Sequence, residues 1–218
     1  MTKVKFYFDQ EKDRLNICNK INHPAKFGTF KVEEKLRKIC FGRKLKDCRS
    51  DLINYLKPLY SSEKISAYLK SIEIGWRPIE KEFFKRADNL FGKKLGVDVK
   101  AFLTTINICP YDPDEHWFMI SFAYPIPLTL MTCGHEIMHL YFHDFYWKAI
   151  EKEIGKSKTE DLKEALTVLL NLEFRGLGFA EDEGYSEHKA LRAFITKEWK
   201  IDRDFTTLMQ KCISYLKQ

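Results

Sequence analysis

Residues 133–146 (CGHEIMHLYFHDFY) contain three histidines at four-residue spacing and a glutamate beside the first of them. On an α-helix, His135 and His139 project from one face a turn apart, so both imidazoles can reach a single metal ion. Neutral imidazole is a good ligand for Zn²⁺, which takes three protein ligands and one open position in catalytic sites. Glu136 is rotated around the helix, where its carboxylate can accept a proton from water. This HExxH spacing predicts a zinc-dependent hydrolase.

The third histidine, His143, lies two helical turns from His135, about 12 Å along a straight axis. That distance is too great for both side chains to bind one ion, so the third ligand must come from another segment. We expect His143 to support the site, line a cleft or pack in the core. Burying two histidines and a glutamate in so apolar a helix is costly unless they have a partner, and a metal ion provides one. The alternative is a pair of solvent-facing or hydrogen-bonded histidines without a metal.

A strand-rich hairpin, the HExxH helix and a glutamate on the next helix together resemble the zincin metallopeptidases, in the gluzincin arrangement typified by thermolysin. The resemblance covers roughly residues 97–190. It implies zinc-dependent hydrolysis of peptide bonds and a sheet whose edge strand holds an extended peptide above the metal. It also implies a glutamate as third ligand. Glu164 is 25 residues beyond His139, which fits a loop and a return helix, and Glu183 and Glu187 are the alternatives.

Tyr185 and His188 are candidates to stabilise the negative charge that develops on the substrate's carbonyl oxygen. Zincins commonly supply such a group from a downstream segment, and both residues follow the acidic run EDE. The alternative is a helix N-terminus whose acidic residues face its dipole, with the two rings packed internally. Tyr141 and Tyr146 lie past the ligands on the motif helix, and we expect them to fill the core.

The elements around these residues indicate an α+β fold, with a small sheet or hairpin packed on the motif helix. Residues 3–9 predict a strand. Alternation in residues 97–101 and an aromatic, β-branched run in residues 117–124 flank turn residues at 110–115, which predicts a β-hairpin. A helical pattern is expected over about residues 31–91, with one helix opening near Pro78 and ending before Gly92. Further helices are expected from Pro127 through the motif, from near Ser157 to before Gly176, and at about 184–197 and 204–216.

The charge is unevenly distributed along the chain. Residues 1–100 carry 24 Lys and Arg against 13 Asp and Glu, whereas residues 101–218 carry 13 against 18. We therefore expect a basic, mainly helical region over residues 1–95 and a zincin-like core over residues 96–218. A basic half can bind nucleic acid or another acidic partner, but lysines spread this widely are also typical of a solvated helical surface.

Cysteine usage and hydropathy favour a cytoplasmic protein with reduced thiols. The six cysteines contain no CxxC pair, and the first residues lack the apolar run of a signal peptide. The uncharged run at 117–134 is interrupted by Pro125 and Pro127 and leads directly into the motif. A buried strand followed by a buried helix explains it better than a membrane span.

The leading hypothesis is a zinc metallopeptidase acting on a peptide or protein substrate, without membrane association. Two other hypotheses remain open. The first is a regulatory or nucleic-acid-associated zinc protein that uses the basic half. The second is a zinc hydrolase of a non-peptide amide, because the same chemistry activates water whatever the acyl group.

Overall fold

A four-stranded sheet lies at the centre of the α+β fold in the computed structural model, which describes residues 2–23 and 32–218. The strand order is β1-β2-β4-β3. The β1–β2 and β2–β4 pairs are parallel, whereas β3 is antiparallel to β4 at the edge. The strand predicted over residues 3–9 is confirmed as β1. The strands are β1 (Val4–Tyr7), β2 (Val99–Thr104), β3 (Tyr111–Asp112) and β4 (Trp117–Ser121).

The prediction that residues 97–101 and 117–124 pair with each other as a hairpin is wrong. β2 and β4 are parallel neighbours, with Ala101 opposite Phe118. The intervening chain passes along the sheet and adds β3 before it turns into β4, so the turn residues at 110–115 belong to a β3–β4 hairpin. Alternation identifies which residues are extended, but it does not specify the strand with which they pair.

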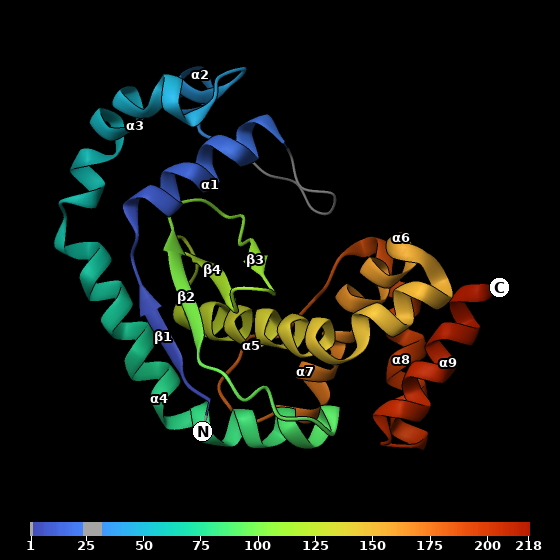
Figure 1. Cartoon of the computed structure of the whole chain (residues 1–218). Coiled ribbons are helices and arrows are strands. Elements are labelled where there is room, and N and C mark those ends of the chain that lie inside the picture. Colours follow the sequence, from blue (N-terminus) through green and yellow to red (C-terminus); the bar gives the residue numbers. More distant parts are fainter. Residues whose placement is uncertain (1, 24–31) are drawn as a thin grey trace.

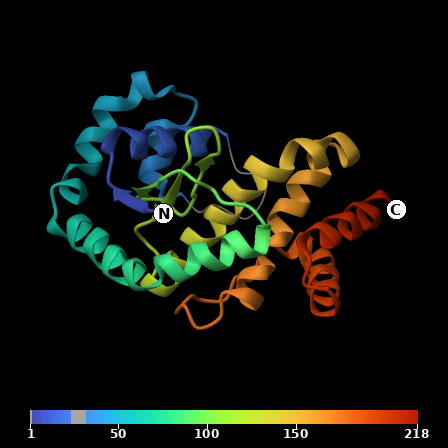
Figure 2. The ribbon, with the colours of Figure 1, turned by 60° about the horizontal axis from the view of Figure 1, so that its bottom comes forward.

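Helices surround the sheet on several sides. Figure 1 shows α3 and α4 as an arc around one side of the sheet and α5 lying across it, with α6, α8 and α9 grouped on the opposite side. Figure 2 gives the same grouping from another direction. The helices are α1 (Gln10–Asn22), α2 (Glu34–Cys40), α3 (Leu45–Tyr60), α4 (Glu63–Phe91), α5 (Ile126–Phe142), the π-helix η1 (His143–Trp147), α6 (Lys148–Leu166), α7 (Val168–Glu173), the 3₁₀ helix η2 (Ser186–His188), α8 (Lys189–Ile201) and α9 (Phe205–Lys217).

The predicted helices correspond to these elements, but three of them begin elsewhere, since α8 begins at Lys189 and not near residue 184. Residue 31 lies outside the described residues. α4 is continuous through Pro78, so the predicted start there is wrong, whereas its end at Gly92 is confirmed by a left-handed φ of 62°. α6 contains a kink at Gly155 (φ 78°, ψ 160°), just before the start predicted near Ser157. The positive φ explains the glycine, because other residues avoid this conformation.

One large hydrophobic core includes residues from both halves of the chain. It contains Val4 of β1 and Trp76 of α4 together with Ile137 of α5 and Ile195 of α8. A boundary near residue 95 therefore does not separate two hydrophobic cores. A second, smaller cluster lies between α1, α2 and α3.

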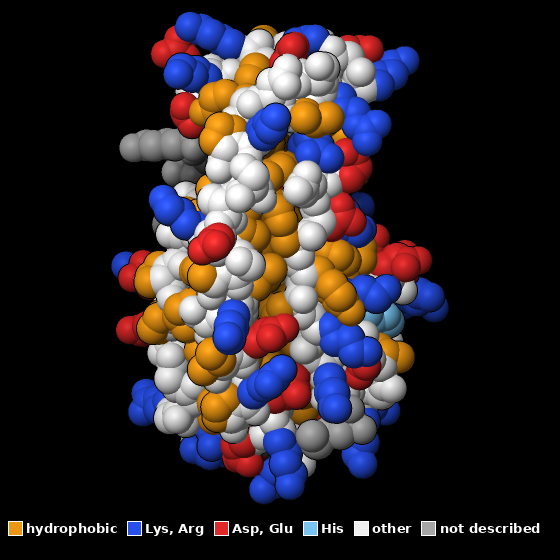
Figure 3. Space-filling model, turned by 90° about the vertical axis from the view of Figure 1, so that its left-hand side faces the viewer, with side chains coloured by type: hydrophobic (Ala, Val, Ile, Leu, Met, Phe, Trp, Pro, Cys, Tyr) orange, Lys and Arg blue, Asp and Glu red, His pale blue; other side chains and the backbone are white. Residues whose placement is uncertain are grey.

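The outer face that carries α3 and α4 has mixed charge. Figure 3 shows Lys and Arg side chains interspersed with Asp and Glu and with hydrophobic side chains, not gathered into a single basic patch. This arrangement is typical of a solvated helical surface. Among the described residues, no helix combines the length and apolarity that a membrane crossing requires.

Candidate metal centre

Helix α5 holds the HExxH residues in a tightly packed environment. Gly134, immediately before the first histidine, is a point of close approach to other segments. A Cβ there would lie 3.1 Å from Phe179 and 3.2 Å from both Leu170 and Phe83. A larger residue would therefore push α5 away from these neighbours. Glycine lets the motif helix pack closely against α4, α7 and Phe179.

The structure brings His135 and His139 of α5 together with Glu164 of α6. Oε2 of Glu164 lies 3.5 Å from Nε2 of His135 and 3.4 Å from Nε2 of His139. All three candidate ligand atoms lie within 4.8 Å of one another. Ligands about 2.0–2.1 Å from a tetrahedral zinc ion are themselves separated by roughly 3.3–3.4 Å. The two nitrogens and one oxygen therefore fit zinc in both chemistry and spacing.

Asp182 orients the first histidine and was missed in the sequence. Its Oδ2 lies 2.7 Å from Nδ1 of His135, which leaves Nε2 directed toward Glu164. A carboxylate behind a metal-binding imidazole fixes the ring and increases its basicity. Asp182 is itself held by Arg192, whose Nη2 is 3.0 Å from Oδ1. The side chain of Asn171 donates a hydrogen bond to the backbone carbonyl of Asp182 and accepts one from its backbone N–H. The acidic run at 181–183 was the available signal.

The carboxylates that the sequence offered as alternatives do not join the cluster. Glu183 and Glu187 are both exposed, and Glu187 accepts a hydrogen bond from Ser186. Neither Glu183 nor Glu187 is therefore placed to bind a metal beside the two histidines.

His188 is buried, with its Nε2 3.4 Å from Oδ1 of Asp161, and it is not one of the described residues that line the cleft beside the site.

A partly buried hydrogen-bonded chain connects Glu164 to His143. Lys163 is only 5% exposed, and its Nζ lies 2.8 Å from Oε1 of Glu164. The same ammonium donates to the Tyr111 hydroxyl at 2.8 Å, and that hydroxyl is 2.7 Å from Nε2 of His143. His143 also stacks on Trp147. Two side chains, Tyr111 and Lys163, thus connect it to the candidate ligand Glu164.

Burial and charge set the protonation of the cluster. Burial lowers the pKa of His139 to about 3, so its ring is neutral and able to bind a metal. Burial also lowers the pKa of His135, but Asp182 outweighs this effect and raises that pKa well above its usual range. Burial opposes ionisation of Glu164, yet the histidines and Lys163 hold its pKa below the usual range. Glu164, the candidate third ligand, is therefore an anion.

Glu136 faces a cleft beside the ligand atoms. It lines a cavity of about 430 Å³ together with His135, Glu164, Tyr111 and Tyr185. Its Oε2 is buried and receives no hydrogen bond from any described residue, and burial raises the pKa of the carboxyl to about 7. A buried carboxylate oxygen without a donor, next to three candidate ligand atoms, is suited to interact with a water molecule or substrate in the cleft.

Replacing Asp182 by asparagine is expected to weaken zinc binding by about 10–100-fold, the usual cost of losing a supporting carboxylate. Asparagine keeps the shape but removes the charge that faces both His135 and Arg192. Zinc affinity is measured by competition with a chromophoric chelator. Asp202→Asn, at an exposed position after α8, is the matched control. Equal affinity in the two variants would show that Asp182 does not support the ligand.

Comparison with known proteins finds no matching family model, no matching curated protein and no matching solved structure. The features that bear on function are those of the site itself. They comprise three converging ligand atoms, a carboxylate that orients one of them, and a buried glutamate beside a cleft.

Proposed function

We propose that this protein is a zinc-dependent metallopeptidase of the zincin type. The observation that carries the proposal is the convergence of His135, His139 and Glu164 at a cleft that Glu136 also lines. His135, His139 and Glu164 hold the ion. When bound, zinc polarises a substrate carbonyl and lowers the pKa of water. The protein supplies the remaining chemistry, which consists of moving a proton, stabilising charge and positioning the substrate.

Glu136 serves as the general base. Its carboxylate accepts a proton from water in the cleft and transfers it to the amine that leaves when the peptide bond breaks. No described residue donates a hydrogen bond to its Oε2, so that oxygen is available to the water. Glu136 follows His135 directly on α5, and it lines the same cleft as His135 and Glu164.

The edge strand β3 is suited to bind an extended substrate. It ends the sheet and runs antiparallel to β4, and its Tyr111 lines the same cleft as Glu136. A peptide can add to such an edge through main-chain hydrogen bonds, with its side chains pointing alternately into pockets. This arrangement agrees with the substrate strand that the resemblance to zincins implies.

The direct test incubates the zinc-loaded protein with a peptide mixture and identifies the products by mass spectrometry. We expect cleavage that is lost when a chelator removes the metal and restored when zinc is added. A parallel panel of small non-peptide amides addresses the other hydrolase hypothesis. Turnover of the amides without peptide cleavage would replace the peptidase proposal, and no zinc-dependent turnover of either class would overturn it.

Tyr185→Phe is expected to lower kcat by about 10²–10³-fold, the usual cost of losing one donor to the developing oxyanion. Tyr185 lines the cleft, whereas His188 does not, so the hydroxyl of Tyr185 is the better-placed candidate. Zinc content and the melting temperature should remain unchanged. His188→Gln is the comparison, since the sequence proposes both residues. A larger loss of kcat in His188→Gln than in Tyr185→Phe would transfer the role.

A further inference from the structure

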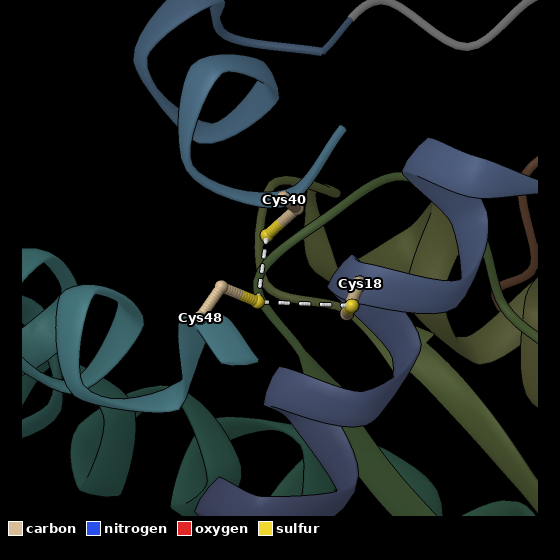
Figure 4. Close-up of side chains that lie close together, drawn as sticks. All are labelled: Cys18, Cys40 and Cys48. Carbon is tan, nitrogen blue, oxygen red and sulfur yellow. Dashed lines mark hydrogen bonds between the residues drawn. The ribbon is translucent and has the colours of Figure 1, made fainter. Parts of the chain in front are cut away.

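Three cysteines that are scattered in the sequence converge between α1, α2 and α3. Cys18 lies in α1, Cys40 ends α2 and Cys48 lies in α3, and Figure 4 shows their thiols directed toward one another. The Sγ atom of Cys48 is 3.9 Å from that of Cys18 and 4.0 Å from that of Cys40, and all three sulfurs lie within 4.8 Å of one another. All three residues are almost completely buried.

The spacing of the sulfurs fits a metal ion better than a disulfide. A disulfide requires two sulfurs at about 2.05 Å, whereas each sulfur here has another at 3.9 or 4.0 Å. A point equidistant from three sulfurs so arranged lies about 2.3–2.5 Å from each, and zinc–thiolate bonds are about 2.3 Å. The three Sγ atoms therefore already occupy positions close to those of three thiolate ligands.

Asn22 fixes the loop between α2 and α3 against α1. Its amide nitrogen donates to the carbonyl oxygens of Cys18, Cys40 and Arg43 at 2.9, 3.0 and 3.1 Å. Its side-chain oxygen accepts from the backbone N–H of Gly42 at 2.8 Å. One side chain thus holds the backbone of two of the three cysteines, which organises the cluster before any ion binds.

The ordinary interpretation is that the cysteines simply pack as small apolar residues. Burial raises the pKa of Cys18 to about 11, so without a metal its thiol stays protonated. However, three of the eight buried residues in this small cluster are cysteines. The other five are leucine and isoleucine side chains. A metal ion bound to all three sulfurs would add stabilisation to this apolar packing, as structural zinc does in small domains.

We propose that Cys18, Cys40 and Cys48 form a second metal site, which binds Zn²⁺ through three thiolates and stabilises the packing of α1, α2 and α3. Binding releases the three thiol protons to solvent and forms three zinc–sulfur bonds. Zn²⁺ with three thiolates leaves a net charge of −1, whereas Cu⁺ would leave −2 in the same buried place, so zinc is the favoured occupant. The site is separate from the HExxH cleft, which none of these cysteines lines.

Cobalt substitution tests the site without requiring peptidase activity. The reduced, metal-free protein is titrated with Co²⁺ while near-ultraviolet absorption is recorded. Thiolate-to-cobalt charge transfer should saturate at one equivalent of thiolate-bound ion per chain and disappear when Zn²⁺ displaces the cobalt. The ligand atoms of His135, His139 and Glu164 include no sulfur, but Cys109 lines the same cleft, so the absorption is assigned by variants. Absence of charge-transfer absorption in the wild-type protein would overturn the proposal.

Variants assign the absorption to the cluster. Cys48→Ala should remove it, whereas His139→Ala should retain it. Cys212→Ala, a buried cysteine in α9 outside the cluster, is the matched control and should also retain it. Retention of the full signal in Cys48→Ala would contradict the assignment. If Cys48→Ala does not fold, the wild-type titration and the His139→Ala variant still decide the question.

Discussion

Glu136→Gln is expected to lower kcat for peptide hydrolysis by about 10²–10⁴-fold, the usual contribution of a positioned general base. Glutamine has nearly the same shape as glutamate, but its amide cannot accept and return a proton. The loss should fall on kcat more than on KM, because the substrate contacts of the cleft remain. Steady-state kinetics on the best peptide from the substrate screen measures both constants.

Zinc binding separates a chemical role for Glu136 from a structural one. The Glu136 side chain is not one of the three converging ligand residues, so the variant should bind zinc with wild-type affinity. Its melting temperature should not fall, because removing a buried carboxylate whose Oε2 receives no hydrogen bond from the described residues does not break an ion pair. Glu153→Gln, an exposed position on α6, is the matched control. Wild-type turnover in Glu136→Gln would eliminate the proposed mechanism.

Glu164→Gln is expected to weaken zinc binding by more than about 100-fold, beyond the effect typical of a supporting residue. The carboxylate is the only anionic member of the ligand set, and both histidines lie within 3.5 Å of its Oε2. Glutamine removes this charge yet can still accept a hydrogen bond from Lys163, so the fold is disturbed as little as possible. Peptide hydrolysis should decrease at limiting zinc and recover partly at high zinc.

Glu183→Gln and Glu187→Gln are natural controls for this experiment, because the sequence leaves all three glutamates open as ligands. Both control positions are exposed and lie outside the ligand cluster. Their zinc affinity and activity should match those of the wild type. A loss of zinc in Glu183→Gln or Glu187→Gln, with normal binding in Glu164→Gln, would show that the metal is held by a different acid.

The motif residues were predictable because their geometry is local. Four residues along an α-helix return to the same face, so the spacing of His135 and His139 brings them together wherever that helix lies. The same short-range periodicity predicted the strand β1 and the start of α9 near Asp204, which accepts a hydrogen bond from the N–H of Thr207. The prediction that a helix begins near Pro78 was wrong, because packing along a 29-residue helix outweighed the local preference of proline for a first turn.

Contacts between distant segments were decided only by the tertiary structure. Whether Glu164, Glu183 or Glu187 faces the histidines depends on how α6 returns across α5, and composition does not record this path. Asp182 reaches His135 across 47 residues. The parallel pairing of β2 with β4 likewise depends on the route of the connecting chain and not on alternation.

The cysteines give the clearest separation between the two sources of information. In the sequence, Cys18, Cys40 and Cys48 show no ligand spacing, and reduced thiols were all that they predicted. In the structure their sulfurs converge, because three helices pack around one small cluster and Asn22 ties the intervening loop to α1. The sequence by itself determined the chemistry that one helix can present. The tertiary structure determined which residues of other segments complete the site, because loop closure and packing bring together residues that are far apart in the sequence.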